Sequence, residues 1–279
     1  MKDSPLARIR WHLAHPLPLL DHLFLRTETH AHCGALAFFA LAGFYPLCQL
    51  VLFVSHHLAA WLPAERVIRE TLREYYPEGQ EFLLRNLAAS AQEFAAGSTL
   101  LQVFWVLVGA AGIFIPLETA FNQLWGAKQQ RPYWRNQAVG FLLTSACCVL
   151  AFVFVIATAA LHTAIDGLAG SPLTRQLTGY VAMRLVALGL SVAVIFLFYR
   201  FLPNAEVRGR QVLPAALAAG VVAEGARWVY LRVLPWLDLP KSQGPFHVSV
   251  SFVLLAYFET FVLLAGAYLA ARPPERPAE

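Results

Sequence analysis

The sequence predicts an all-α membrane protein with six transmembrane helices. Three observations predict this class. Hydrophobic residues make up 58% of the chain and charged residues only 14%, the mean hydropathy is +0.55, and the apolar residues gather in runs long enough to cross a hydrocarbon core of about 30 Å. No hydrophilic tract is long enough for a separate soluble domain, so we expect a single membrane domain over residues 34–271.

Residues 1–33 are expected to form a basic segment at the cytoplasmic face. Their apolar clusters are too short for the core of a cleavable signal peptide, and a full span follows directly. We therefore expect one or two helices that lie in the membrane interface. Five histidines make a metal site conceivable, but their spacing fits no standard zinc pattern, and we predict neither a metal nor a cofactor. These histidines are His12, His15, His22, His30 and His32.

Six apolar runs are predicted to span the membrane. Pro46 lies near the middle of the first run and predicts a kink there, because proline removes a backbone donor and clashes with the preceding turn. A long connection, residues 61–98, follows this run. Pairs such as Glu81 and Arg85 lie one helical turn apart in it and predict two amphipathic helices over about 64–96. The predicted spans cover residues 34–58, 99–116, 138–161, 178–201, 213–233 and 248–271.

The distribution of lysine and arginine predicts that both termini are cytoplasmic. Six spans place both termini on one side, and that side carries twelve basic residues in its short loops and chain ends. The opposite short loops carry only Arg175 and Lys241, with Arg232 at a helix end. Because positive residues accumulate on the cytoplasmic side, the amphipathic helices are expected outside, and residues 272–279 form a cytoplasmic tail. The twelve are Lys2, Arg8, Arg10, Arg26, Lys128, Arg131, Arg135, Arg200, Arg208, Arg210, Arg272 and Arg276.

Four charged residues lie well inside the predicted spans. They are Arg184 in the fourth span, Glu224 and Arg227 in the fifth, and Glu259 in the sixth. A charge at the centre of a transmembrane helix costs on the order of 3 kcal/mol by insertion scales, so such residues are functional candidates. Their positions along the spans place all four at central or outer depths. Glu224 and Arg227 also share a helix face with small residues, which predicts that the charges face the bundle interior.

Two interpretations of these charges remain open. In the first, they form a closed network of ion pairs that holds the helices in register. In the second, they line a polar cavity that is reached from the outer side. A guanidinium group offers a rigid fork of donors, so a cavity with arginines suits a phosphate or carboxylate head group on an amphipathic molecule. Arg184, Glu224, Arg227 and Glu259 are therefore the candidate substrate-cavity residues.

Several segments resemble the YihY/BrkB family of six-span inner-membrane proteins. They are LAFFALAGFYP in the first span, ETAFNQLWG after the second, FLPNAEVRGRQVLP at residues 201–214, and QGPFHVSVSFVLLAYFETFVLLAGAY at the last span. The resemblance covers the chain from Ala35 to Leu269. Residues identified as structural or family-motif positions are Pro46, Glu118, Asn122, Trp125, Leu202, Pro203, Asn204, Tyr230, Gly244 and Gly266.

The chain departs from the family pattern around its last span. It reads Gln243, Gly244, Pro245 where the family has Tyr-Gly-Ser, and Tyr268 follows Gly266 and Ala267 where the family has Gly-Ala-Glu. Glu259 stands where relatives have a small or polar residue. The acidic position of the last span is therefore different in this chain.

The resemblance implies a multi-pass protein of the bacterial inner membrane that acts in the cell envelope. Family members once carried the label ribonuclease BN, but the sequence shows neither a metal-ligand cluster nor a basic aromatic platform for RNA. We therefore predict no nucleic-acid partner and no enzyme activity, a ribonuclease-type enzyme being a distant alternative. The leading hypothesis is a transporter or flippase-like protein for an amphipathic, anionic envelope molecule such as a lipid. The alternative is a non-catalytic scaffold that binds envelope proteins.

Overall fold

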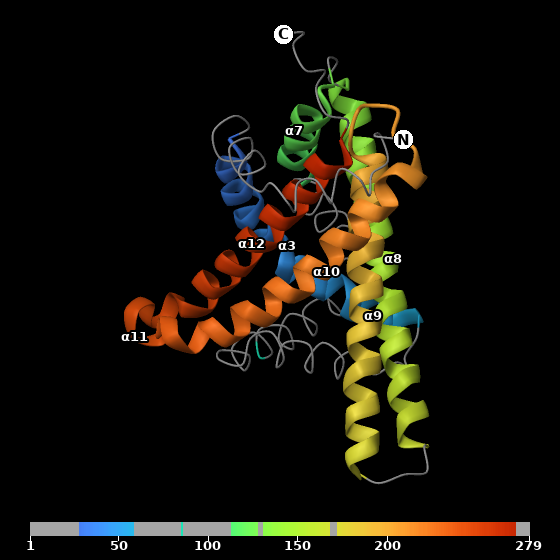
Figure 1. The fold of residues 1–279 in the computed structure, drawn as a ribbon, viewed down its shortest axis with the longest axis vertical. Coiled ribbons are helices and arrows are strands. Elements are labelled where there is room, and N and C mark those ends of the chain that lie inside the picture. The colour runs from blue at the N-terminus through green and yellow to red at the C-terminus, as the bar shows by residue number, and fades with distance from the viewer. Residues whose placement is uncertain (1–27, 59–84, 86–112, 128–130, 168–171, 272–279) are drawn as a thin grey trace, which may run out of the picture.

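The computed structural model describes residues 28–58, 85, 113–127, 131–167 and 172–271, and within these ranges the chain forms helices joined by short turns and irregular connections, with no strand (Figure 1). Residues 1–27 of the predicted interfacial segment lie outside the described residues. The two predicted amphipathic helices, apart from Arg85, and the predicted tail 272–279 also lie outside the described residues. Residues 99–112 of the predicted second span are outside as well.

Four described helices are long and apolar enough to cross a membrane. They are α8 (Tyr133–Asp166), α9 (Pro172–Phe201), α10 (Gly209–Val233) and α12 (His247–Ala270). They correspond to the third, fourth, fifth and sixth predicted spans. The helices α8 and α9 extend several residues beyond the predicted bounds, because only their apolar centres were recognisable as spans. At about 1.5 Å per residue, α8 is roughly 50 Å long and exceeds the thickness of a hydrocarbon core.

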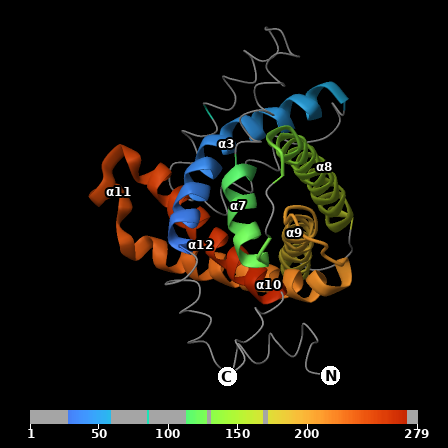
Figure 2. The same cartoon turned by 90° about the horizontal axis from the view of Figure 1, so that it is seen from above.

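The helix α3 (Thr29–Leu58) contains the first predicted span. It begins five residues earlier than expected, so residues 29–33 belong to this helix and not to a separate N-terminal segment. Thr29 and Cys33 are buried, which agrees with the earlier start. The helix continues through Pro46 and changes direction along its length as it passes from α12 towards α8 (Figure 2).

The short helix α7 (Phe114–Trp125) lies at one end of the bundle (Figure 1), where it contacts α3, α8 and α12 and projects between them in the view from above (Figure 2). Its first turn covers residues 114–116, which were predicted to end the second span. Leu117 and Phe121 are buried in the core. Gly126 ends the helix with φ of 62°, a left-handed conformation that glycine adopts without steric cost.

The long helices pack in the order α8, α9, α10, α12, α3, each against the next. Small residues allow the closest of these approaches. A Cβ atom at Gly220 of α10 would lie 2.5 Å from Val192 Cγ2 of α9. One face of α10 is thus buried through Ala216, Gly220 and Ala223, as its small-residue spacing predicted.

Three short elements join α10 to α12: η2 (Leu234–Leu237), α11 (Leu239–Gln243) and η3 (Gly244–Phe246). They form the elbow at the left of Figure 1. Gly244 has φ of 56° and ψ of −130° between α11 and η3. Side chains with a Cβ rarely adopt this backbone conformation, which gives the motif glycine a structural role in turning the chain into α12.

Gly266 provides a test of this packing. A Cβ at this position would overlap the Tyr199 hydroxyl and lie 2.8 Å from Ala219 Cβ. Overpacking a rigid core costs about 1–3 kcal/mol, so we expect Gly266→Ala to lower the thermal unfolding temperature in detergent by several degrees. Gly189→Ala is the matched control, because nothing lies within 4 Å of its added Cβ. Equal unfolding temperatures of the two variants would contradict the assigned contact.

Candidate functional site

A cluster of four charged side chains lies where α9, α10 and α12 meet. Arg227 of α10 is its centre. Its Nε lies 2.7 Å from Glu259 Oε1 of α12, and its Nη1 lies 2.6 Å from Glu224 Oε1, one turn away on α10. A second guanidinium nitrogen, Nη2, donates to Glu259 Oε2 at 3.4 Å. The two terminal nitrogens and Nε thus connect two carboxylates from two helices.

The helix α9 completes the cluster. Arg184 Nη1 lies 3.8 Å from Glu224 Oε2. Ser191 accepts a hydrogen bond from Arg227 Nη2 at 3.3 Å and donates to Glu224 Oε1 at 3.3 Å. Two arginines therefore face two glutamates, and the formal charge of the cluster is zero. The structure brings together all four residues that the sequence singled out.

The four side chains are partly buried, with between 16% and 26% of each side chain exposed. This intermediate burial sets the cost of keeping these groups charged. Charges that are fully desolvated lose several kcal/mol each, which ion pairs restore only with good geometry. Here the bidentate contact between Arg227 and Glu259 supplies that geometry, because guanidinium and carboxylate groups match in shape.

A cavity of about 530 Å³ adjoins this cluster. Arg227, Glu259, Ser191 and Thr260 provide polar groups in its lining, whereas Arg184 and Glu224 do not line it. The other walls are mainly apolar and come from α3, α8, α9, α10 and α12, with Phe44, Phe154, Phe198, Phe252 and Leu255 among them. A cavity of this volume falls within the range of about 300–1,000 Å³ that is typical of small-molecule sites.

Ser191 and Thr260 were not recognised from the sequence. A single hydroxyl residue in an apolar helix resembles any other, because such side chains usually bond to their own backbone. The sequence contains one signal for Ser191, which is its spacing from Arg184. Ser191 follows Arg184 by seven residues and therefore lies on the same helical face.

A second polar cluster lies at the turn between α9 and α10. Asn122 Oδ1 of α7 accepts a hydrogen bond of 2.7 Å from the backbone N–H of Asn204. Asn122 also donates to Glu118 at 3.4 Å, and Glu118 lies 3.8 Å from Arg131. Burial raises the pKa of the Glu118 carboxyl, while the Arg131 charge and the Asn122 amide act in the opposite direction. These contacts attach α7 to the Leu202, Pro203, Asn204 turn.

Arg131 satisfies the end of α9. Its guanidinium donates to the carbonyl oxygens of Phe201, Leu202 and Pro203 at 3.1–3.2 Å. The last carbonyls of a helix lack intrahelical partners, and a cation there also interacts favourably with the helix dipole. The sequence marked Arg131 only as a topology signal, because its partners lie about seventy residues away along the chain.

Trp125, Gly266 and Tyr230 act as packing residues. Trp125 stacks on Phe121 with ring centroids 5.4 Å apart, and both rings contact Tyr199. The Tyr199 hydroxyl donates to the carbonyl of Leu263 at 2.8 Å, in the space that Gly266 leaves open. Tyr230 of α10 donates to the Ser251 carbonyl of α12 at 2.7 Å. These motif residues therefore join the helices to one another.

The described helices define a multi-pass α-helical membrane protein, with polar clusters inside an otherwise apolar bundle. The chain belongs to the family described as virulence factor BrkB, whose model matches residues 24–278. This result confirms the family resemblance drawn from the motifs.

Individual relatives are named as membrane proteins. The chain is 25% identical over 260 residues to a UPF0761 membrane protein of Aromatoleum aromaticum, which covers 92% of this chain and 63% of that protein. It is 26% identical over 271 residues to a UPF0761 membrane protein of Pseudomonas paraeruginosa, covering 90% and 60%. The chain thus spans less than two thirds of the length of these relatives. No solved structure shows a significant match.

The Arg227 pair can be tested by a double-mutant cycle. Removing one partner of a buried pair costs about 3–5 kcal/mol, because it leaves an uncompensated charge. We expect Arg227→Met to lower stability more than Glu259→Gln does. The double variant should be more stable than the sum of the two losses predicts, with a coupling above about 1 kcal/mol. The measurement is thermal unfolding in nanodiscs, and additive losses would show that the pair does not couple α10 to α12.

Arg131 gives a second test at the other cluster. Hydrogen bonds from a charged donor contribute about 1.5–3 kcal/mol in mutational series, so Arg131→Ala should lower the unfolding temperature markedly. Arg135→Ala is the matched control, since Arg135 is exposed in the first turn of α8 and its loss should cost under about 0.5 kcal/mol. If both variants unfold at the same temperature, the capping role of Arg131 is wrong.

Proposed function

We propose that this protein moves an amphipathic, anionic envelope molecule such as a phospholipid between the leaflets of the bacterial inner membrane. The observation that carries the proposal is the cavity with apolar walls and a polar patch at Arg227 and Glu259. The apolar walls suit acyl chains, and the guanidinium suits the phosphate of a head group.

The charge arrangement supports a transient role for Arg227. In the absence of substrate, both neighbouring carboxylates neutralise it. An anionic head group would compete with Glu259 for the guanidinium, because phosphate and carboxylate accept the same two parallel hydrogen bonds. Arg184, at 3.8 Å from Glu224, could then compensate that carboxylate. This exchange keeps Glu224 paired, whereas Glu259 gives up its guanidinium partner, which is the electrostatic cost of the bound state.

The alternative function is a non-catalytic membrane scaffold for envelope proteins. One observation favours it: the ion pairs are closed within the bundle, as expected for charges that hold helices in register. The two functions differ in what they require of the cavity. Transport needs an open cavity, whereas a scaffold tolerates a filled one.

The proposal can be tested with purified protein in vesicles that contain fluorescently labelled phosphatidylglycerol. Lipid in the inner leaflet is protected from dithionite unless the protein exchanges it between leaflets. We expect the unmodified chain to expose the label, and Arg227→Gln to slow exchange about tenfold, equivalent to about 1.4 kcal/mol. The control is Arg232→Gln on the same helix, since Arg232 stacks on Trp228, outside the cavity.

A second variant separates loss of transport from loss of folding. Ala187→Trp fills the cavity from α9 and leaves the charged cluster intact. A folded Ala187→Trp protein should also lose exchange. If the unmodified chain behaves like empty vesicles, or if the filled variant keeps full exchange, transport through this cavity is excluded and the scaffold function is favoured.

A further inference from the structure

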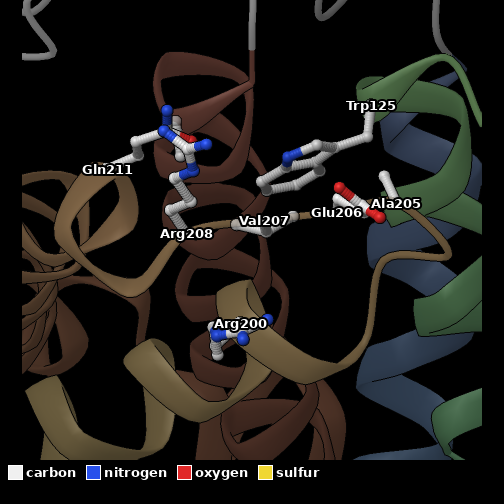
Figure 3. Close-up of a pocket in the computed structure, with 8 residues that line it drawn as sticks. Trp125, Arg200, Ala205, Glu206, Val207, Arg208 and Gln211 are labelled. Atoms are coloured by element: carbon white, nitrogen blue, oxygen red, sulfur yellow. The ribbon is translucent and has the colours of Figure 1, made fainter.

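A second pocket, of about 640 Å³, lies beside the turn between α9 and α10. Trp125 of α7, Arg200 of α9, Arg208 and Gln211 line it together with residues 205–207 and Ala270 (Figure 3). None of its lining residues belongs to the cavity beside Arg227. The pocket is therefore a separate feature, and its function does not depend on the proposed transport.

The pocket carries an excess of positive charge. Arg200 and Arg208 line it with a single carboxylate, that of Glu206. Neither arginine forms an ion pair within the part of the chain that the structure describes. The carbonyl of Phe201 at the end of α9 is bonded by Arg131, which also donates to the carbonyls of Leu202 and Pro203, so Arg200 is not needed there. Its guanidinium instead lies 5.5 Å from the Phe201 ring centroid.

The beginning of α10 adds to this positive potential. The N-cap residue of this 25-residue helix is Arg208, which makes no side-chain capping hydrogen bond, and the first turn contains no acidic residue. Helix N-termini carry a partial positive charge and normally attract acidic side chains. Arg208 at this end repels that partial charge, and the arrangement becomes favourable when an anion binds beside the helix N-terminus.

Two further hydrogen-bond donors belong to the same pocket. Figure 3 shows the Trp125 indole beside Arg208, and the Gln211 side chain emerges from the first turn of α10. The indole N–H is a donor only, and the pocket wall is otherwise formed by short side chains such as Ala205 and Val207. Donors thus outnumber acceptors in this pocket, which suits an anion rich in acceptor oxygens.

We propose that this pocket binds a phosphate group, with Arg200 and Arg208 as the charged donors. The phosphate belongs either to a phospholipid head group or to a soluble phosphate ester, since both present the same acceptor oxygens. Trp125 and Gln211 orient the group through single hydrogen bonds. The positive-inside distribution explains why basic residues lie on this side of the membrane, but it does not require them to line a pocket.

The experiment uses the full chain in nanodiscs and has two arms. In the first, pyrophosphate is titrated against protein in phosphatidylcholine nanodiscs, and binding is followed by the rise in unfolding temperature. In the second, native mass spectrometry counts the phosphatidylglycerol molecules retained from mixed nanodiscs. The double variant Arg200→Gln with Arg208→Gln should weaken binding by at least about tenfold in the responding arm, as expected for lost charge-assisted hydrogen bonds.

The matched control is Arg210→Gln, which removes one positive charge from the same helix end without altering the pocket lining. It should bind within about twofold of the unmodified chain, because surface charge contributes little at physiological salt. If the double variant does not fold, Arg208→Gln alone, at an exposed side chain, carries the same test.

The outcomes separate the possible ligands. A response to pyrophosphate alone identifies a soluble phosphate ester, a response to phosphatidylglycerol alone identifies a lipid head group, and both support the pocket. The proposal is overturned if neither probe responds, if the double variant binds as well as the unmodified chain, or if Arg210→Gln loses as much affinity. A failure of leaflet exchange in the vesicle assay leaves these outcomes unchanged.

Discussion

The rest of the bundle depends on Arg227, because this one guanidinium pairs with carboxylates on two helices. Glu224 lies on its own helix and Glu259 on α12, so the pair fixes the rotation and the axial position of α10 against α12. Ser191 extends the constraint to α9. In an apolar environment, a shift of one helix by a single turn would separate these charges at a cost of several kcal/mol. The cavity beside them keeps its shape for the same reason.

The other end of the bundle is held by different chemistry. There the backbone supplies most of the hydrogen-bond partners. Arg131 donates to the last carbonyl of α9 and to two carbonyls of the turn that follows it, and Asn122 accepts from the N–H of Asn204. These contacts place residues 205–208 beside Trp125, where the basic pocket forms. Between the two ends, close approaches at Gly220 and Gly266 bring α10 against its neighbours. The two polar ends are thus connected through tightly packed helices.

The elements predicted best were those with long apolar runs, because hydrophobicity over a full helix is a strong signal. Four predicted spans correspond to α8, α9, α10 and α12, and the meeting of Arg184, Glu224, Arg227 and Glu259 followed from their depths along these spans. The short helix α7 was missed. Its Leu117 and Phe121 face the core, but twelve residues after an apolar run give too weak a periodicity to separate a new helix from the end of a span.

The sequence by itself determined the class of protein, the family and the four charged residues inside the apolar runs, because composition and motifs are local properties of the chain. Only the tertiary structure decided which side chains meet. It placed Arg227 and Glu259 on the cavity lining and Arg184 and Glu224 outside it, and it changed Arg131 from a topology signal into the cap of α9. Helix rotation and long-range contacts set these differences, since a residue's depth along a span does not specify the neighbour that its side chain reaches.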